Sequence, residues 1–103
     1  MGGSVTSKVS DEEVVISIDG AFSFEVHNQF LAAYTMDEEV IAGKNFVVDL
    51  AKTNFCDSSA LGMLLILREK AAETESSIKI INTTPEIRKI LETARFHTLF
   101  NIS

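Results

Sequence analysis

Residues 55–65 read FCDSSALGMLL, and this stretch decides how the rest of the chain is interpreted. An acid and two hydroxyls, Asp57, Ser58 and Ser59, stand between an aromatic residue expected to be buried, Phe55, and an almost unbroken apolar run. Asp and Ser are preferred N-cap residues, because their side-chain oxygens accept hydrogen bonds from the unpaired N–H groups of a first helical turn. The stretch therefore predicts that a helix begins here, with Asp57 or Ser58 as its N-cap.

The predicted helix, from residue 58 to about residue 74, is too apolar for an ordinary surface helix. With about 100° between successive residues, one narrow apolar stripe can face a sheet. Its members are Ala60, Leu64, Leu67 and Ala71. A second band falls on the far side and comprises Ser58, Gly62, Leu65, Ile66 and Glu69. Small and apolar side chains on an outward face, next to two hydroxyls, indicate a protein contact surface.

Strands and helices alternate along the rest of the chain. The hydrophobic periodicity and the turn residues predict the following elements. They are a hairpin of strands 5–9 and 14–19 that ends at Gly20, a helix over about 24–36, a turn at 41–45, a strand at 46–50, the helix from 58, a strand at 78–81, a helix from the N-cap Thr84 and Pro85 to about 94, and a short strand at 99–102. This alternation predicts an α/β fold, a mixed sheet of about four to five strands with crossover helices packed on it.

Composition limits the class of protein. The chain has 103 residues, of which 46% are hydrophobic and 23% charged, and this predicts one globular domain over residues 1–103, with residues 1–4 as a flexible N-terminus. The net charge is −6, and no cluster of Lys and Arg exists, so nucleic acid and anionic membrane surfaces are disfavoured as partners. No apolar stretch approaches the roughly 20 residues that span a bilayer. Cys56 is the only cysteine, which fits a reducing cytoplasm.

Three kinds of catalytic or metal site are weighed and set aside. A serine hydrolase needs a base near its nucleophile, but the chain has only His27 and His97 and lacks a Gly-x-Ser-x-Gly elbow. Asp49 ends a predicted strand, as the phosphoacceptor of a receiver domain does. A receiver also needs an acidic pair after its first strand and a lysine after a late strand, and this chain has neither. Asp49 is therefore interpreted as a strand-end residue that bonds to nearby backbone. Cys56 and the two histidines have no metal-ligand spacing. We therefore expect no catalysis, no metal and no cofactor.

The two serines allow more than one interpretation. The simplest is that they belong to a helix cap. Alternatively, Ser58 accepts a phosphate, which adds about −1.5 to −2 charges. The helix dipole favours an anion at this turn, whereas Asp57 and an apolar partner surface oppose it. The second interpretation predicts little change in the fold and a large loss of partner binding.

The stretch VVDLAKTNFCDSSALGMLL, residues 47–65, resembles the signature of the STAS family, and specifically of bacterial anti-sigma factor antagonists. In that family a hydrophobic strand ending in Asp-Leu leads, through a short loop and an aromatic residue, to Asp-Ser-Ser-Gly/Ala-Leu-Gly at the start of a helix. VVISIDGAF, residues 14–22, resembles the family's second strand and its glycine turn. Residues 77–102 resemble the closing strand, the Pro-capped helix and the C-terminal segment, so the resemblance covers nearly the whole chain.

This resemblance implies a phosphoprotein that takes part in a partner switch regulating transcription. Ser58 would be the phosphoacceptor, with Ser59 as the alternative. The kinase is usually the anti-sigma factor itself, and a serine phosphatase reverses the reaction. The unphosphorylated antagonist binds the anti-sigma factor and frees its target, and phosphorylation ends that binding. The implied contact comprises Asp57, Ser58, Ser59, Gly62, Leu65, Ile66 and Glu69; the sigma pathway and the oligomeric state are left open.

Two positions depart from the family pattern. Many relatives carry Asp three residues after the strand-ending glycine, where this chain has Ser23, and Ala60 replaces the commoner glycine. An alternative function is a non-phosphorylated STAS scaffold, for example a subunit on the cytoplasmic side of a transporter or in a stress-signalling assembly. The intact Asp-Ser-Ser motif favours the switch, because a scaffold has no need for a hydroxyl there.

Overall fold

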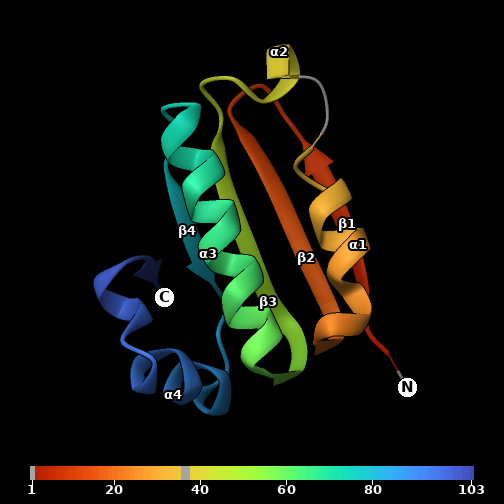
Figure 1. The fold of residues 1–103 in the computed structure, drawn as a ribbon, viewed down its shortest axis with the longest axis vertical. Helices are drawn as coiled ribbons and strands as arrows, with labels where there is room; N and C mark the ends of the chain where they lie inside the picture. The colour runs from red at the N-terminus through yellow and green to blue at the C-terminus, as the bar shows by residue number, and fades with distance from the viewer. Residues whose placement is uncertain (1, 36–37) are drawn as a thin grey trace.

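A five-stranded mixed sheet organises the computed structural model, which describes residues 2–35 and 38–103 (Figure 1). The elements in chain order are β1 (Ser4–Val9), β2 (Glu13–Phe22), the 3-10 helix η1 (Phe24–Val26), α1 (His27–Ala32), α2 (Glu38–Ile41), β3 (Asn45–Cys56), α3 (Ser58–Glu73), β4 (Ile78–Ile81), α4 (Pro85–Thr93), the 3-10 helix η2 (Phe96–Thr98) and β5 (Asn101–Ile102). The strand order is β1-β2-β3-β4-β5; β1 is antiparallel to β2, and the other pairs are parallel. The predicted fold class is therefore confirmed.

The predicted hairpin is confirmed, but its strands have different ends. Ser4, expected in a flexible segment, already pairs with Asp19 as the first residue of β1. The second strand does not stop at Gly20 but continues to Phe22. Gly20 has φ +89°, a backbone conformation that residues with a Cβ rarely adopt, and this conformation accommodates a shift in the register between β2 and β3. The strand expected at 46–50 is likewise longer and continues to Cys56 beside the extended β2.

The segment after β2 also differs from its prediction. A helix was expected over about 24–36, whereas the structure has η1 followed by the short α1 (His27–Ala32). The expected helix rests on the helical spacing of the apolar residues Val26, Phe30, Ala33 and Tyr34, and all four are indeed buried. Met36 lies outside the described residues. The four-residue α2 falls next to the predicted turn at 41–45, and four residues are too few for a helical periodicity to be recognised.

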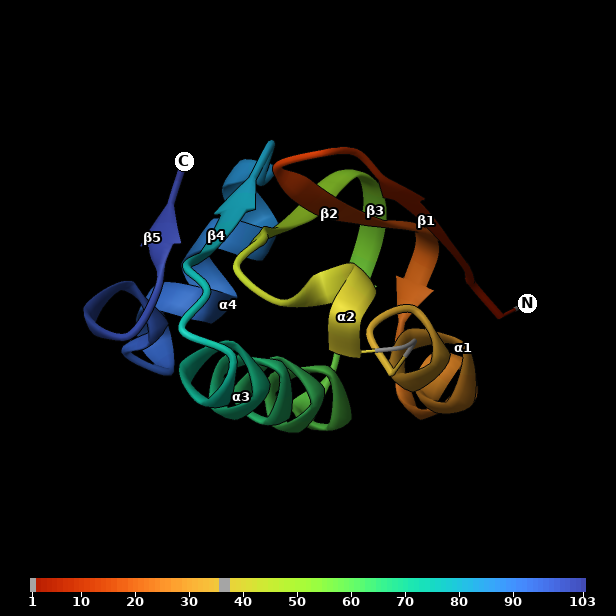
Figure 2. The same ribbon diagram turned by 90° about the horizontal axis from the view of Figure 1, so that it is seen from above.

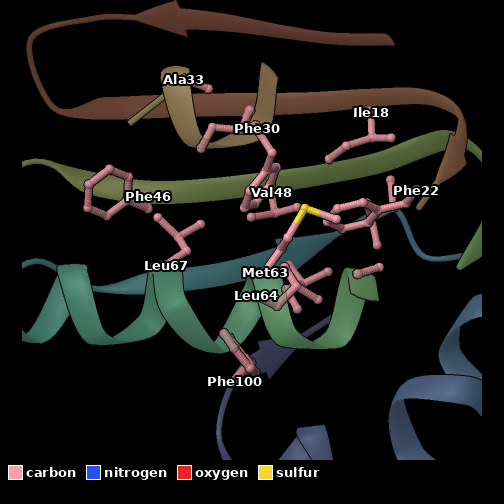
Figure 3. Packing of buried hydrophobic residues seen from close by; sticks show 14 of the residues in the cluster. Ile18, Phe22, Phe30, Ala33, Phe46, Val48, Met63, Leu64, Leu67 and Phe100 are labelled. Carbon is pink, nitrogen blue, oxygen red and sulfur yellow. The ribbon is translucent and has the colours of Figure 1, made fainter. Parts of the chain in front are cut away.

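One face of the sheet carries the core. Figure 2 shows α1 and α3 on the same side of the strands. In β2 the buried Val14, Ile16 and Ile18 alternate with more exposed residues, which is the pattern of a sheet covered on one face. Met63 and Leu67 point from α3 toward this face (Figure 3). The apolar stripe predicted for α3 is fully in this core; Ala60, Leu64, Leu67 and Ala71 are at most 2% exposed.

The C-terminal third follows the predicted order. β4 has the expected bounds, and α4 begins at Pro85 with Thr84 as its N-cap, whose Oγ1 accepts a hydrogen bond from the Ile87 N–H at 3.3 Å. α4 ends at Thr93, one residue before the predicted end. The last strand is shorter than the expected 99–102, because η2 occupies residues up to Thr98 and only Asn101–Ile102 pair with β4.

Candidate functional site

The candidate site lies where β2 and β3 end and α3 begins, at the lower end of the view in Figure 1. The parallel register places Ala21 beside Phe55 and Phe22 beside Cys56. The Asp57 N–H then donates to the Phe22 carbonyl oxygen at 3.3 Å. The loop that follows β2 is therefore held next to the first turn of α3.

Asp57 is the N-cap of α3. Its backbone is extended, with φ −105° and ψ −176°, and its carboxylate Oδ1 accepts a hydrogen bond from the Ala60 N–H at 3.0 Å. This answers which of the two candidates caps the helix: the carboxylate of Asp57 makes the capping bond, and Ser58 is the first helical residue. Ser58 therefore has no capping role.

The Ser58 side chain is exposed, and its hydroxyl makes no hydrogen bond to any of the described residues. Ser59, the alternative phosphoacceptor, is half-buried. A kinase must bring a phosphate donor to the hydroxyl oxygen, so accessibility favours Ser58 over Ser59. Ser58 is also at the positive end of a 16-residue helix, which is a favourable place for a phosphate.

The outward band of α3 is where the helical wheel places it. Leu65 is 39% exposed and Ile66 48% exposed, although both are large aliphatic side chains. Glu69 is exposed and Gly62 is half-buried, and a Cβ at Gly62 would meet no atom within 4 Å. These residues and Ser58 thus form one accessible apolar surface along the helix.

Two exposed aromatic residues extend this surface and were missed by the sequence analysis. Phe55, expected to be buried, is 52% exposed, because the next residue of β3, Cys56, takes the inward position. Phe24 is 69% exposed and stacks on His27, with ring centroids 5.7 Å apart. The exposure of Phe24 could have been recognised in the sequence, because Phe24 does not share the helical spacing of the buried Val26 and Phe30. Exposed Phe side chains at the end of β3 and the start of η1 are typical anchors of a protein interface.

Ser23 follows β2, at the position where the resemblance to the STAS pattern leads one to expect an acid. It is half-buried, and its carbonyl oxygen accepts a hydrogen bond from the Val26 N–H at 3.1 Å. A serine at this position carries no charge, and its carbonyl oxygen makes the first hydrogen bond of η1.

A groove of about 590 Å³ adjoins the band on its other side. It runs between α3 and α4 and is lined by Leu61, Ile90, Thr93 and Ala94, with Glu86 and Lys89 also in its wall. Leu61 precedes Gly62 of the band, so the accessible apolar surface continues from α3 toward α4.

The other residues considered in the sequence analysis, Asp49 and Cys56, lie outside this surface. Asp49 Oδ1 accepts a hydrogen bond from the Ala51 N–H at 3.0 Å, as predicted, and another from Asn82 Nδ2 at 3.1 Å. Asp49 is not at the end of its strand, however, because β3 continues to Cys56. Burial, with a smaller contribution from the Asp57 charge, raises the pKa of the Cys56 thiol to about 11. No group of three or more His, Cys, Asp or Glu side chains among the described residues is arranged to hold a metal ion.

Comparison with known proteins assigns the family. The family model described as "Mlab, STAS domain" matches residues 5–101. The chain belongs to the STAS-domain family. A STAS-domain containing protein of Pseudomonas aeruginosa (strain UCBPP-PA14) is 44% identical over 92 residues, which are 89% of each chain.

Solved structures share this STAS fold at low sequence identity. SpoIIAA, an anti-sigma factor antagonist, matches in its unphosphorylated form with TM-score 0.74 at 20% identity, over 99% of this chain and 87% of SpoIIAA. The phosphorylated form of SpoIIAA from Bacillus matches with TM-score 0.72 at 19% identity, over 99% and 91%. A sulfate transporter family protein from Wolinella succinogenes matches with TM-score 0.77 at 15% identity, over 91% and 75%. Within the described residues of this STAS domain, no helix is long and apolar enough to cross a membrane.

Proposed function

We propose that this STAS domain is a cytoplasmic anti-sigma factor antagonist that is switched off by phosphorylation of Ser58. The observation that carries the proposal is the Ser58 hydroxyl, which is exposed, unbonded among the described residues and bordered by exposed apolar side chains. SpoIIAA, an anti-sigma factor antagonist of the same fold with an unphosphorylated and a phosphorylated form, supports this proposal.

The apolar surface around Ser58 binds the anti-sigma factor in the unphosphorylated state. Its contact residues are Asp57, Ser58, Ser59, Gly62, Leu65, Ile66 and Glu69, to which the structure adds Phe24 and Phe55 as exposed neighbours. Burial of exposed aromatic and aliphatic side chains supplies the binding free energy at about 25 cal/mol per Å² of apolar area. The chain itself performs no catalysis and holds no cofactor; it is the substrate of a serine kinase and of a serine phosphatase.

Phosphorylation reverses binding through local charge and not through refolding. The phosphate adds about two negative charges to a surface that must lose its water in the complex, and a buried, unpaired charge is costly. The adjacent Asp57 contributes negative charge as well, and its Oδ1 already accepts the hydrogen bond from the Ala60 N–H. The capping bond does not use the Ser58 hydroxyl, so the helix persists when that oxygen is modified.

Intact-mass measurement and site mapping of the protein from its native cells test the switch. The expected result is a fraction heavier by one phosphate and mapped to Ser58, with further conversion in lysate and ATP. Ser58→Ala removes the shift, whereas the matched Ser59→Ala variant keeps it. An unmodified population under all growth conditions, with no shift in lysate and ATP, would contradict the proposal.

The second candidate function is a STAS scaffold that binds a partner without being phosphorylated. The likeness to a sulfate transporter family protein favours it, because that protein has the same fold. A scaffold would use the same apolar surface, and its binding would be unchanged by incubation with lysate and ATP. The mass measurement therefore separates the two functions.

A further inference from the structure

A polar pocket of about 400 Å³ lies on the part of the sheet formed by β1, β2 and β3. Its polar lining residues are Ser4, Thr6, Ser17, Asp19, Asp49 and Lys52. In β2, Ser17 and Asp19 alternate with the buried Ile16 and Ile18, so the pocket is on the sheet face turned away from the core. Ser58 and its apolar surroundings are not part of this pocket.

Strand pairing arranges these side chains in two rows across the sheet. Thr6 pairs with Ser17, and Ser17 pairs with Asp49. Ser4 pairs with Asp19, and Asp19 pairs with Lys52. Each row thus contributes hydroxyl and charged groups to one concave surface.

An irregularity in the register brings the opposite charges together. From Ser17 to Asp19 β2 advances two residues, while β3 advances three, from Asp49 to Lys52. In an unbroken parallel register Ala51 would face Asp19, and no positive charge would stand beside that carboxylate. The extra residue in β3 therefore places the Lys52 ammonium in the same pocket as the Asp19 carboxylate.

These two charged groups have no partner within the described part of the chain. Neither the Asp19 carboxylate nor the Lys52 ammonium makes a hydrogen bond or an ion pair to another described residue, although both line the pocket. Asp49, in contrast, is fixed by the Ala51 N–H and by Asn82 Nδ2, both of which bond its Oδ1. The pocket therefore offers one held carboxylate, one free carboxylate, one free ammonium and three hydroxyls.

We propose that this pocket binds a small zwitterion, namely a free α-amino acid with a polar side chain. The ligand's ammonium group donates to the Asp19 carboxylate, and its carboxylate accepts from the Lys52 ammonium. Hydrogen bonds between charged groups are about twice as strong as neutral ones, and a ligand of only one charge would leave Asp19 or Lys52 unpaired. The Thr6 and Ser17 hydroxyls, in the neighbouring row, bond the polar side chain. This site is separate from the Ser58 surface and does not depend on the proposed function.

An NMR titration of the full ¹⁵N-labelled chain with L-serine tests the proposal. We expect amide shifts around Ser17, Asp19 and Lys52, with a dissociation constant on the order of 1 mM. N-acetyl-L-serine, which lacks the ammonium, and L-serinamide, which lacks the carboxylate, are expected to bind roughly 10-fold more weakly. No shift up to about 20 mM L-serine, which corresponds to a negligible affinity, would overturn the proposal.

Matched variants locate the two charges. Asp19→Asn and Lys52→Met are each expected to weaken L-serine binding by roughly 10-fold. Asp11→Asn and Lys79→Met make the same substitutions at exposed positions outside the pocket and are expected to leave binding unchanged. The amide spectrum of each variant shows directly whether it is folded. Equal binding of L-serinamide, or unchanged binding by both pocket variants, would overturn the proposal.

Discussion

At the scale of single residues, the cap of α3 and the proposed phosphoacceptor are two different residues, Asp57 and Ser58, whereas the sequence alone allowed Ser58 to be both. The Asp57 carboxylate makes the capping hydrogen bond to the Ala60 N–H, so the neighbouring hydroxyl is available for chemistry. A residue that both capped the helix and accepted a phosphate would alter the first turn whenever it was modified. In the proposed switch, this separation would let a phosphate change the surface and leave the helix intact.

Replacement of Ser58 by Glu tests this separation. Ser58→Glu is expected to unfold at the wild-type temperature, because the Asp57 cap is kept. It is expected to bind the proposed anti-sigma factor at least roughly 10-fold more weakly, a loss of about 1.4 kcal/mol. Ser58→Ala, which cannot accept the phosphate, is expected to stay bound to the partner when ATP is added. A pull-down and a thermal unfolding curve measure both properties, and Ser7→Glu, on exposed β1, is the charge control. Wild-type binding by Ser58→Glu would show that charge is not what releases the partner.

Phe24 is expected to be an anchor of the same interface. Its side chain is 69% exposed, so Phe24→Ala removes little core packing and is expected to leave the melting temperature unchanged. Truncation of an anchoring aromatic at an interface costs about 2 kcal/mol or more, which weakens binding by at least roughly 30-fold. Leu99→Ala, at an exposed apolar residue of the C-terminal segment, is the matched control. An equal affinity of the two variants, measured by calorimetry, would remove Phe24 from the contact.

At the scale of elements, the sequence was most informative where a pattern is long. The 16-residue α3 was predicted to within one residue, because its cap and its apolar stripe both mark it. Phe55 was misjudged because residue type suggests burial, whereas the inward position in β3 belongs to the next residue, Cys56. The end of β2 was misjudged because Gly20 is read as a turn when it stands alone in sequence. Only the pairing of β2 with β3 shows that Gly20 accommodates an irregularity inside a strand.

The cap of α3 has a measurable effect on stability. Asp57→Ala is expected to lower the free energy of unfolding by about 1 kcal/mol, because the Ala60 N–H loses its side-chain acceptor. For a chain of this size the melting temperature falls by about 4–8 °C. Urea unfolding measures the change in the free energy of unfolding. Asp57→Asn keeps a hydrogen-bond acceptor and is expected to lose less stability than Asp57→Ala. Thr84→Ala removes the equivalent cap of α4 and serves as a comparison. If Asp57→Ala is as stable as the wild type, the capping bond contributes nothing in solution.

The two faces of α3 are expected to respond oppositely to substitution. Ile66→Glu is expected to weaken partner binding and to change the stability by less than about 0.5 kcal/mol, since Ile66 is 48% exposed. Leu67→Ala, one residue later and fully buried, is expected to cost about 2–5 kcal/mol of stability. Ala72→Glu places the same charge about 21 Å along the helix from Ser58 and is the control for binding. A large fall in melting temperature for Ile66→Glu would show that this side chain is in the core.

At the scale of the whole molecule, the sheet separates two surfaces with different chemistry. The face that carries α1 and α3 also carries the apolar surface around Ser58, and the opposite face carries the polar pocket with Asp19 and Lys52. The register connects them, because the same β2–β3 pairing that holds Phe22 near Asp57 also places Lys52 beside Asp19. Sequence patterns predicted the first surface through a single helix. The second needed the pairing of three strands, which no local pattern contains.

The stability of the whole fold is expected to fall in alkaline solution, and Cys56 is one cause. Burial raises the pKa of its thiol from the ordinary value of 9.0 to about 11, so between these pH values the folded chain keeps a proton that the unfolded chain releases. This stabilising contribution is complete below pH 9 and is lost as the pH rises toward 11. Burial also raises the pKa of Tyr34, which adds a loss of the same sign at higher pH.

Urea unfolding of the wild type and of Cys56→Ala at pH 7, 9 and 10.5 isolates the thiol. Both proteins are expected to lose stability above pH 9, but the wild type more steeply, because the alanine variant has no thiol to ionise on unfolding. The comparison is between slopes, so the constant cost of the smaller side chain in the core cancels. Tyr34→Phe separates the phenol in the same way. Identical slopes for the wild type and Cys56→Ala would mean that the Cys56 thiol ionises as readily in the folded chain as in the unfolded one.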